Sequence, residues 1–409
     1  MCQNDIRAMK YLRLQISYII SNLSDGIGIA AFPLILAQSG GSAMEIGALA
    51  AVATLPGLLI VLPAGAMVDR VSTRTTMFST SLMRAIICLL IACLWISMNH
   101  HHLLILQIGV LALSCLDIIY DLAGPKMLTN LIKDKSLLVH ANARLNFIET
   151  LGSRFIGAPL AGFLATMGAL LPVLVMAPLY FIAACVIFFI RYDEKIAKIE
   201  QEKTPYFKFI FHGFQFMLRS TVLKTLAFNS ALCNLSLAAS SAIMVVFLTR
   251  HLHAPAWSFG LLYSCLAVGG AIGAVIAPKI LRRFGLGLTL QLTLFILPIL
   301  MGILAISQSP WIVGMQQAVL GLVLTIWGIG STVYRQSIIP HELLGRVLSI
   351  NRLIVFSSMP IGSILGGYLA MRFGYEITFL ILAMLMTMSW TQIAKFSPRI
   401  LNHIEMSAN

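Results

Sequence analysis

The chain has 409 residues, of which 59% are hydrophobic and 11% are charged, with a formal net charge of +13. Soluble domains usually contain about 25% charged residues, so this composition excludes an ordinary soluble protein. Apolar stretches of roughly 20 residues recur along nearly the whole length, and each is long enough to cross a bilayer as a helix. They are too long for the strands of a membrane β-barrel, which span about 10 residues. The sequence therefore predicts an all-α membrane protein that crosses the bilayer many times.

The first apolar stretch follows Arg7, Lys10 and Arg13. A secretory signal peptide begins in the same way, but this stretch is longer than the apolar core of a signal peptide and has no clear cleavage site. We therefore expect an uncleaved first helix. In all, we predict twelve transmembrane helices, centred on residues 14–37, 45–68, 75–98, 102–124, 142–166, 169–191, 222–249, 257–280, 287–307, 310–333, 350–371 and 375–396.

Lys and Arg residues are concentrated in alternate loops. On this assignment only Arg250 and Arg372 lie on the opposite face, while Arg84 and Arg154 lie within predicted helices. Because positively charged loops remain in the cytoplasm, both termini are expected to be cytoplasmic. Membrane topology thus explains the net charge, and no nucleic-acid partner is expected.

The longest polar segment, RYDEKIAKIEQEKTPYFKF (191–209), separates the sixth and seventh helices. It runs into FKFIFHGFQFMLRS (207–220), an amphipathic stretch that could lie on the inner membrane surface. We expect an N-terminal six-helix bundle at 1–191, a linker at 192–220 and a C-terminal six-helix bundle at 221–409. The halves resemble each other, since GAPLAGFLA (157–165) pairs with GSILGGYLA (362–370). Such repeats are typical of transporters that work by alternating access around a midplane site.

A charged hairpin, GAMVDRVSTRTTM (65–77), joins the second and third helices. Gly65 would allow close helix approach. Asp69 could bind basic groups or a helix N-terminus across the two halves and hold the inner side shut. Arg70 and Arg74 could bind lipid headgroups or partner acids.

This hairpin resembles the cytoplasmic signature of the major facilitator superfamily, Gly-x-Leu-x-Asp-Arg-x-Gly-Arg-Lys. Gly65, Asp69, Arg70 and Arg74 match, and Met67 stands for the Leu. The resemblance implies the major facilitator fold, with twelve helices in two pseudo-symmetric bundles. It also implies a protein of the bacterial cytoplasmic membrane that works as a monomer on small-molecule cargo, is not an enzyme and needs no cofactor.

Two further motifs point to subgroups of that superfamily. GSRFIGAPLAG (152–162), with Gly157, Pro159 and Gly162, resembles its Gly-rich antiporter motif, although generic small-residue packing would look similar. YRQSIIPHELLGRVLSINRL (334–353) resembles the branch with macrolide-efflux and enterobactin-export proteins. There we expect Glu342 to open a helix and Arg346 to reach Asp69 or the loop between the fourth and fifth helices, in a gating role.

Charged residues within the predicted helices are candidates for the transport mechanism, because an unpaired charge in hydrocarbon is costly. All lie in the first half: Asp25, Arg84, Asp117, Asp121, Glu149 and Arg154. We expect ion pairs of Arg84 or Arg154 with Asp117 or Glu149. Four acids outnumber two bases, so at least one acid lacks a basic partner of its own.

A carboxylate without a basic partner can take up a proton in hydrocarbon and release it to water. We predict Asp25 as the proton carrier, with Asn22 on the same face; a structural Asp bound by Asn22 and Ser24 is the alternative. Asp121 is expected at the membrane edge beside Lys126. The Arg-x-x-Gln-Gly pattern of many antiporters is absent from the fourth helix.

The resulting hypothesis is a proton-coupled secondary exporter of small amphipathic molecules, such as drugs or a secreted siderophore. A proton-coupled importer of a nutrient or ferri-siderophore would share the fold. An intramembrane aspartyl protease and a transport-inactive receptor are remote alternatives. The expected partners are protons, the cargo and the lipid bilayer. The cysteines and the outer histidines of MNHHH (98–102) and RHLH (250–253) predict no metal site.

Overall fold

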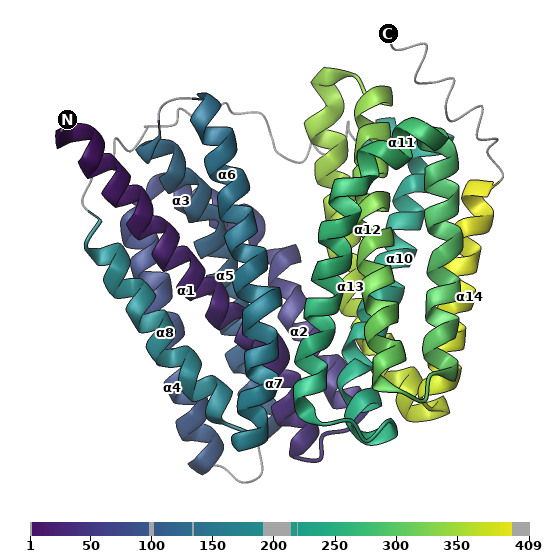
Figure 1. Cartoon of the computed structure of the whole chain (residues 1–409), viewed down its shortest axis with the longest axis horizontal. Helices are drawn as coiled ribbons and strands as arrows, with labels where there is room; N and C mark the ends of the chain where they lie inside the picture. The colour runs from purple at the N-terminus through teal and green to yellow at the C-terminus, as the bar shows by residue number, and fades with distance from the viewer. Residues whose placement is uncertain (1, 98–101, 133–134, 191–213, 219, 395–409) are drawn as a thin grey trace. The chain divides into compact units, whose positions relative to one another are not determined.

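The computed structural model describes residues 2–97, 102–132, 135–190, 214–218 and 220–394. Within these ranges the chain is built from helices joined by short connections, and no strand is present (Figure 1). The predicted linker at 192–220 lies mostly outside the described residues, except for a helical turn at 214–218.

The first half of the chain contains eight α-helical segments and one π-helical segment among the described residues. They are α1 (Cys2–Gln38), α2 (Ala43–Leu59), α3 (Val61–Arg70), α4 (Thr73–Ser97), α5 (His102–Leu131), α6 (Lys135–Thr150), η1 (Leu151–Gly157), α7 (Ala158–Met167) and α8 (Leu171–Phe188). α2 and α3 form one span bent by 58°. Pro56 and Pro63 flank this bend, where a proline removes a helix hydrogen bond. α6, η1 and α7 follow each other without a break.

The second half contains α10 (Thr221–Val246), η2 (Phe247–His251), α11 (Ala256–Ile306), α12 (Pro310–Ile338), α13 (His341–Phe373) and α14 (Tyr375–Ala394). α11 has 51 residues, about twice the length of one membrane crossing. Gly285 interrupts it with φ 73° and ψ 165°, a conformation that favours glycine. α11 therefore represents two spans that meet at Gly285.

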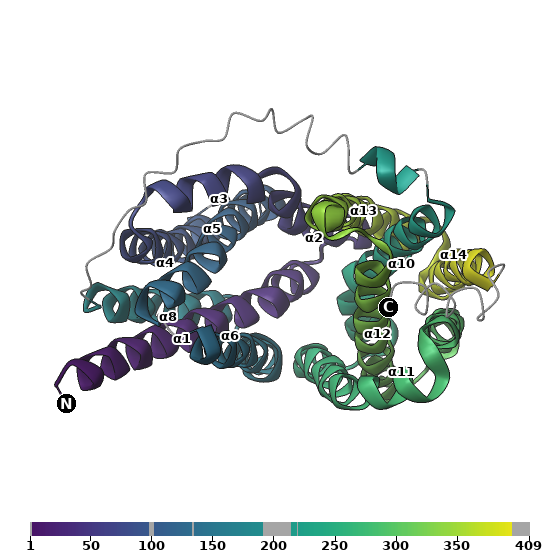
Figure 2. The ribbon, with the colours of Figure 1, turned by 90° about the horizontal axis from the view of Figure 1, so that it is seen from above.

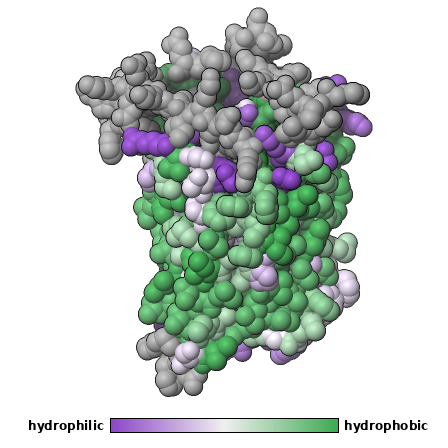
Figure 3. Space-filling view, turned by 90° about the vertical axis from the view of Figure 1, so that its left-hand side faces the viewer, coloured by the Kyte–Doolittle hydropathy of each residue, from purple (hydrophilic) through white to green (hydrophobic). Residues whose placement is uncertain are grey.

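The described helices confirm a polytopic membrane protein. Nine of them are long and apolar enough to cross a membrane, and the bent pair α2 and α3 adds a tenth. Dividing α11 at Gly285 and counting α6–η1–α7 as one span then gives the twelve helices predicted. Large apolar side chains such as Val275, Met315 and Met384 are exposed on the surface. Figure 3 shows a hydrophobic band across one face, with hydrophilic residues gathered toward one end.

The chain forms two compact units. The first comprises Met1–Gly41, Val52–Glu200 and Ala254–Ser264, and the second comprises Ser42–Ala51, Gln201–His253 and Cys265–Asn409. Two helices are divided between the units, since the start of α2 belongs to the second unit and the start of α11 belongs to the first. The proposed domain boundaries at 191 and 221 remain a prediction.

In the first unit, α1 packs against α5, α6, α7, η1 and α8 (Figure 2). The crossing of α1 with η1 is very close, because a Cβ at Gly26 would lie 2.2 Å from the carbonyl oxygen of Ser153. Gly157 faces Leu23 in the same way, with 2.6 Å between a Cβ and the carbonyl oxygen. Small residues are typical where membrane helices approach this closely.

In the second unit, α10 packs mainly against α13 and α14. The same kind of crossing recurs here, because a Cβ at Gly362 would lie 2.2 Å from the carbonyl oxygen of Leu235 on α10. Gly157 and Gly362 occupy matching positions in GAPLAGFLA and GSILGGYLA. The repeat predicted from the sequence therefore has a matching packing contact in each unit.

Candidate functional site

The core of the first unit contains one fully buried guanidinium, that of Arg84 on α4. Its Nη1 lies 3.0 Å from Oδ1 of Asp25 on α1 and 3.2 Å from Oδ1 of Asp117 on α5. Its Nη2 donates to Oγ of Ser21 at 3.0 Å. One base thus binds acids from two other helices, and the cluster Asp25–Arg84–Asp117 links α1, α4 and α5.

Two tyrosines complete this cluster. The guanidinium carbon of Arg84 lies 4.5 Å from the ring centroid of Tyr120 on α5 and 4.7 Å from that of Tyr180 on α8. At these distances each ring attracts the cation. Tyr180 Oη also donates to Oδ1 of Asp25 at 2.6 Å. Arg84 on α4 is therefore held in position by side chains of three other helices, and Asp25 accepts bonds from α4 and α8.

The periodicity of the helices explains how these side chains meet. Ser17, Ser21 and Asp25 recur every four residues of α1, which places them on one face. On α5, Asp117 and Tyr120 are three residues apart and share a face in the same way. Ser17 Oγ donates to the carbonyl oxygen of Ala183 on α8 at 3.0 Å, which extends the polar contacts along α1.

The cluster has two carboxylates and one guanidinium. It is therefore either singly negative or neutral with one bound proton. The acids differ in access, because the side chain of Asp25 is 14% exposed and that of Asp117 is 38% exposed. Asp117 is thus the more accessible of the two acids, while Asp25 is enclosed.

The structure corrects part of the predicted pairing. Arg84 pairs with Asp117, as expected, but it also pairs with Asp25, which therefore has a basic partner. Asn22 is buried and donates to the carbonyl oxygen of Tyr18 at 2.8 Å, so its amide nitrogen binds the backbone of its own helix and does not support Asp25. Asn22 and Asp25 share a helix face but form no hydrogen bond, because the amide of Asn22 is bound by the nearby carbonyl oxygen of Tyr18.

The other charges of this unit are less tightly held. Glu149 and Arg154 are both exposed, and neither forms an ion pair with any residue that the structure describes. Of the alternatives expected, the pair present among the described residues is therefore Arg84 with Asp117. Asp121 is half-buried, and Lys126 pairs with Asp69 at 3.3 Å instead of with Asp121.

The charged hairpin has contacts within the first unit. The Asp69–Lys126 pair ties α3 to α5, and Lys126 Nζ also donates to the carbonyl oxygen of Val68 at 2.6 Å. Arg74 donates to the carbonyl oxygen of Phe188 and lies 5.3 Å from its ring centroid. Arg70 is exposed. The close approach expected at Gly65 is absent, since a Cβ there would meet no atom within 4 Å.

The glycines of the fifth membrane span lie at close helix contacts within the first unit. Pro159 lies in the first turn of α7, next to η1, and Gly162 would place a Cβ 2.8 Å from Cα of Trp257 at the start of α11. The side chains of Glu342 and Arg346, expected at the gate, lie outside the described part of the structure.

Sequence reasoning missed two residues. Tyr180 has no polar neighbour in sequence that would mark it as a ligand of Asp25. Arg335 was taken for a loop residue, but α12 extends to Ile338, and the Arg335 side chain is buried and donates to Oγ of Ser230 at 2.9 Å. The expected span ended near residue 333, two residues before Arg335, so the second half contains a buried base that was not expected.

A bundle of membrane-spanning helices with an ion-pair cluster enclosed between four of them defines a polytopic membrane transport protein. The family model described as Major Facilitator Superfamily matches residues 14–359. The chain therefore belongs to the major facilitator superfamily.

Relatives and solved structures agree with that family. The chain is 25% identical to the multidrug efflux pump Tap of Mycolicibacterium fortuitum over 393 residues, covering 93% of this chain and 94% of Tap. It is also 25% identical to the MFS-type transporter YfiS of Bacillus subtilis over 391 residues, covering 92% of this chain and 90% of YfiS.

Solved structures share the fold at low identity. The nucleoside transporter NupG superposes with a TM-score of 0.78 at 12% identity, covering 95% of this chain and 100% of NupG. A bacterial homologue of the iron transporter ferroportin, in its inward-facing state, superposes with a TM-score of 0.75 at 16% identity, covering 94% of this chain and 98% of the homologue.

Proposed function

We propose that the protein is a proton-coupled secondary exporter of small amphipathic molecules, drugs or a secreted metabolite such as a siderophore, that works by alternating access. The Asp25–Arg84–Asp117 cluster carries this proposal, because it combines two acids with one base inside a membrane-spanning unit. The similarity to multidrug efflux pumps over nearly the whole chain supports export as the direction.

Asp117 exchanges the proton in this mechanism. Arg84 neutralises Asp25, which also accepts from Tyr180, so the second negative charge falls on the more accessible Asp117. Without a proton, Asp117 attracts a cationic or hydrogen-bonding group of the cargo. With a proton, the cluster is neutral and releases that group. Among the candidate charges, Asp117 therefore replaces Asp25 as the proposed proton carrier. Asp25 is its fixed partner, and Glu149 and Arg154 are secondary sites.

Gating belongs to the charged hairpins in this proposal. Asp69, held by Lys126, together with Gly65, Arg70 and Arg74, controls opening toward the cytoplasm. Glu342 and Arg346 act with them from the second half. The chain works as a monomer in the bacterial cytoplasmic membrane, with both termini in the cytoplasm.

Reconstituted vesicles test the coupling. We expect a pH gradient to drive movement of a fluorescent lipophilic cation such as ethidium through the wild-type protein. Asp117→Asn keeps the Asp25–Arg84 pair, so it should still fold, and should lower gradient-driven transport at least tenfold while cargo exchange without a gradient remains. Glu376→Gln, an acid paired with His251 elsewhere in the chain, is the matched control.

Two results would contradict this proposal. Normal gradient-driven transport by Asp117→Asn would remove Asp117 from the coupling step. Uptake into cells that requires the protein, in place of export, would favour the importer. A peptidase is disfavoured because Arg84 binds both Asp25 and Asp117, whereas an aspartyl protease needs two carboxylates that share a proton.

A further inference from the structure

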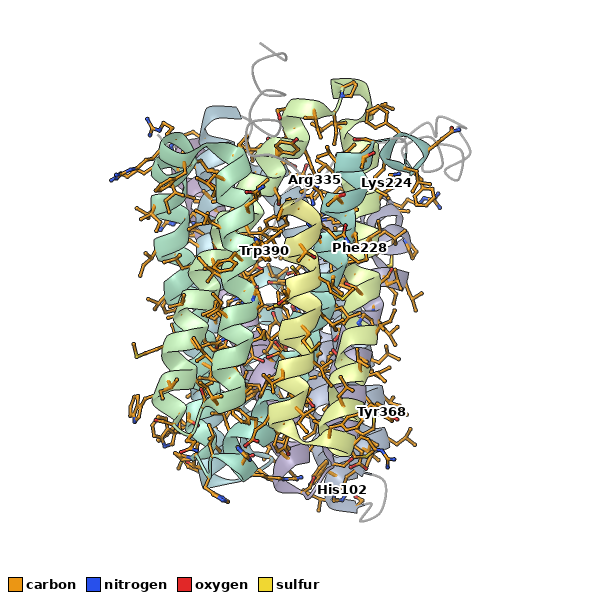
Figure 4. The ribbon with its side chains drawn as sticks, turned by 90° about the vertical axis from the view of Figure 1, so that its right-hand side faces the viewer. His102, Lys224, Phe228, Arg335, Tyr368 and Trp390 are labelled. Atoms are coloured by element: carbon orange, nitrogen blue, oxygen red, sulfur yellow. The ribbon has the colours of Figure 1, made fainter. Side chains whose placement is uncertain are left out.

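The second unit has an open pocket between α10 and α14. Lys224, Thr225, Phe228 and Gln392 line it, and its volume is about 280 Å³. Lys224 and Phe228 are four residues apart on α10 and therefore lie on one face. Figure 4 shows Lys224 nearer the end of the bundle and Phe228 below it.

The lining combines a positive charge with an apolar wall. Lys224 is exposed and forms no ion pair with the residues that the structure describes. The Phe228 ring is 48% exposed, so one edge of the pocket is aromatic and open to the surroundings. Such a pocket fits a ligand with an anionic head and an apolar body.

The surroundings of the pocket have the composition of a membrane–water interface. Trp390, two residues before Gln392 on α14, packs against Phe295 with 5.1 Å between ring centroids. Tryptophan and lysine are both enriched at the level of lipid headgroups. In the helical turn just before α10, Phe214 and Leu218 are exposed whereas Met217 is buried. That turn thus has one apolar side against the protein and another apolar side outward.

Basic pockets between membrane helices near the cytoplasmic surface bind phospholipid headgroups. We propose that the pocket between α10 and α14 binds an anionic phospholipid. The phosphate of the lipid lies beside Lys224, and the part of its acyl chain nearest the headgroup lies against Phe228. Charge complementarity selects an anionic lipid over a zwitterionic one. This site is independent of the proposed transport mechanism, since it needs neither the cargo nor the Asp25–Arg84–Asp117 cluster.

Thermal unfolding of the purified full-length protein in a mild detergent tests the site. The probes are dioleoylphosphatidylglycerol, dioleoylphosphatidylcholine and inorganic phosphate. We expect saturable stabilisation by the phosphatidylglycerol alone. Lys224→Gln should weaken its apparent affinity about fivefold, as one lysine near an anionic headgroup contributes, and Lys224→Arg should keep it. Lys279→Gln, an exposed lysine on α11 outside the pocket, is the matched control.

An equal response of Lys224→Gln and the wild type would overturn the proposal, as would an equal loss in Lys279→Gln. Stabilisation by inorganic phosphate that depends on Lys224 would overturn the lipid assignment and leave a simple anion site. Phe228→Ala keeps the charge of Lys224. It should weaken the binding of phosphatidylglycerol without changing any response to inorganic phosphate. Because the readout is binding, its failure is separate from a failure of proton coupling.

Discussion

Arg84 is the residue on which the candidate site depends. Its charge is buried, and it is compensated by Asp25 and Asp117 on two other helices. Removing one partner of a buried ion pair leaves an uncompensated charge, which costs more than the pair itself contributes. Substitutions in this cluster can therefore be ranked by expected loss of stability, according to how many charges each leaves without a partner.

Arg84→Ala should destabilise the protein by about 3–5 kcal/mol, because it leaves the enclosed Asp25 and the partly exposed Asp117 without a base. Arg84→Lys should be milder, since the charge remains but the planar fork and the stacking on Tyr120 and Tyr180 are lost. The yield of monodisperse protein and the thermal unfolding midpoint measure this order. Equal midpoints for Arg84→Ala and the wild type would contradict it.

The two acids can be compared in the same way. Asp117→Asn leaves one acid and one base, whereas Asp25→Asn combined with Asp117→Asn leaves Arg84 without an anion. We expect the single variant to unfold near the wild-type temperature and the double variant to unfold at a clearly lower one. If the double variant were as stable as the single one, Arg84 would have another counter-ion.

At the scale of helices, the crossings of α1 with η1 and of α10 with α13 decide which faces meet. Gly26 and Gly157 allow the first crossing, and Gly362 allows the second. The first crossing also orients α1, which carries Asp25, so helix packing and the charge cluster are connected.

Gly26→Ala should therefore disturb both stability and transport. Its Cβ would lie 2.2 Å from a backbone carbonyl oxygen, so the helices must separate, and overpacking of this kind costs at least about 1–3 kcal/mol. Gly302→Ala on α11 is the matched control, because a Cβ there meets nothing within 4 Å. Unfolding midpoints and proteoliposome transport measure both variants. Similar losses in the two would show that the crossing is unimportant.

For the whole molecule, the distribution of Lys and Arg predicts that both termini face the cytoplasm. Green fluorescent protein fused to the C-terminus should fluoresce, because it folds in the cytoplasm, and alkaline phosphatase at the same place should be inactive. An active phosphatase fusion would reverse the orientation. It would also move the pocket beside Lys224 to the outer leaflet.

Much of the fold could be predicted from the sequence. Each membrane helix needs about 20 apolar residues, a requirement that is local and therefore visible in a single chain. The break in α11 was predicted as a loop between two spans, and Gly285 lies there. The end of α12 was placed too early, because helix residues beyond the apolar span, such as Arg335, are polar, and their buried contacts cannot be seen in the sequence.

The site was predicted only in part. The six charges of the first half could be named, because charge within an apolar stretch is conspicuous, but the partners could not. Sequence spacing shows which residues share a face of one helix, and says nothing about which faces of four helices meet. Only the tertiary structure brought Asp25, Arg84 and Asp117 together and added Tyr180 from α8.

The sequence alone determined the membrane class, the number of spans, the repeat and the charges that lie within the helices of the first half, because the length and polarity of each helix can be seen separately. The tertiary structure decided that Asp25 has a base, that Asp117 is the accessible acid and that Arg335 is buried. Those properties depend on packing between helices, where the distance from one side chain to another sets both charge balance and access.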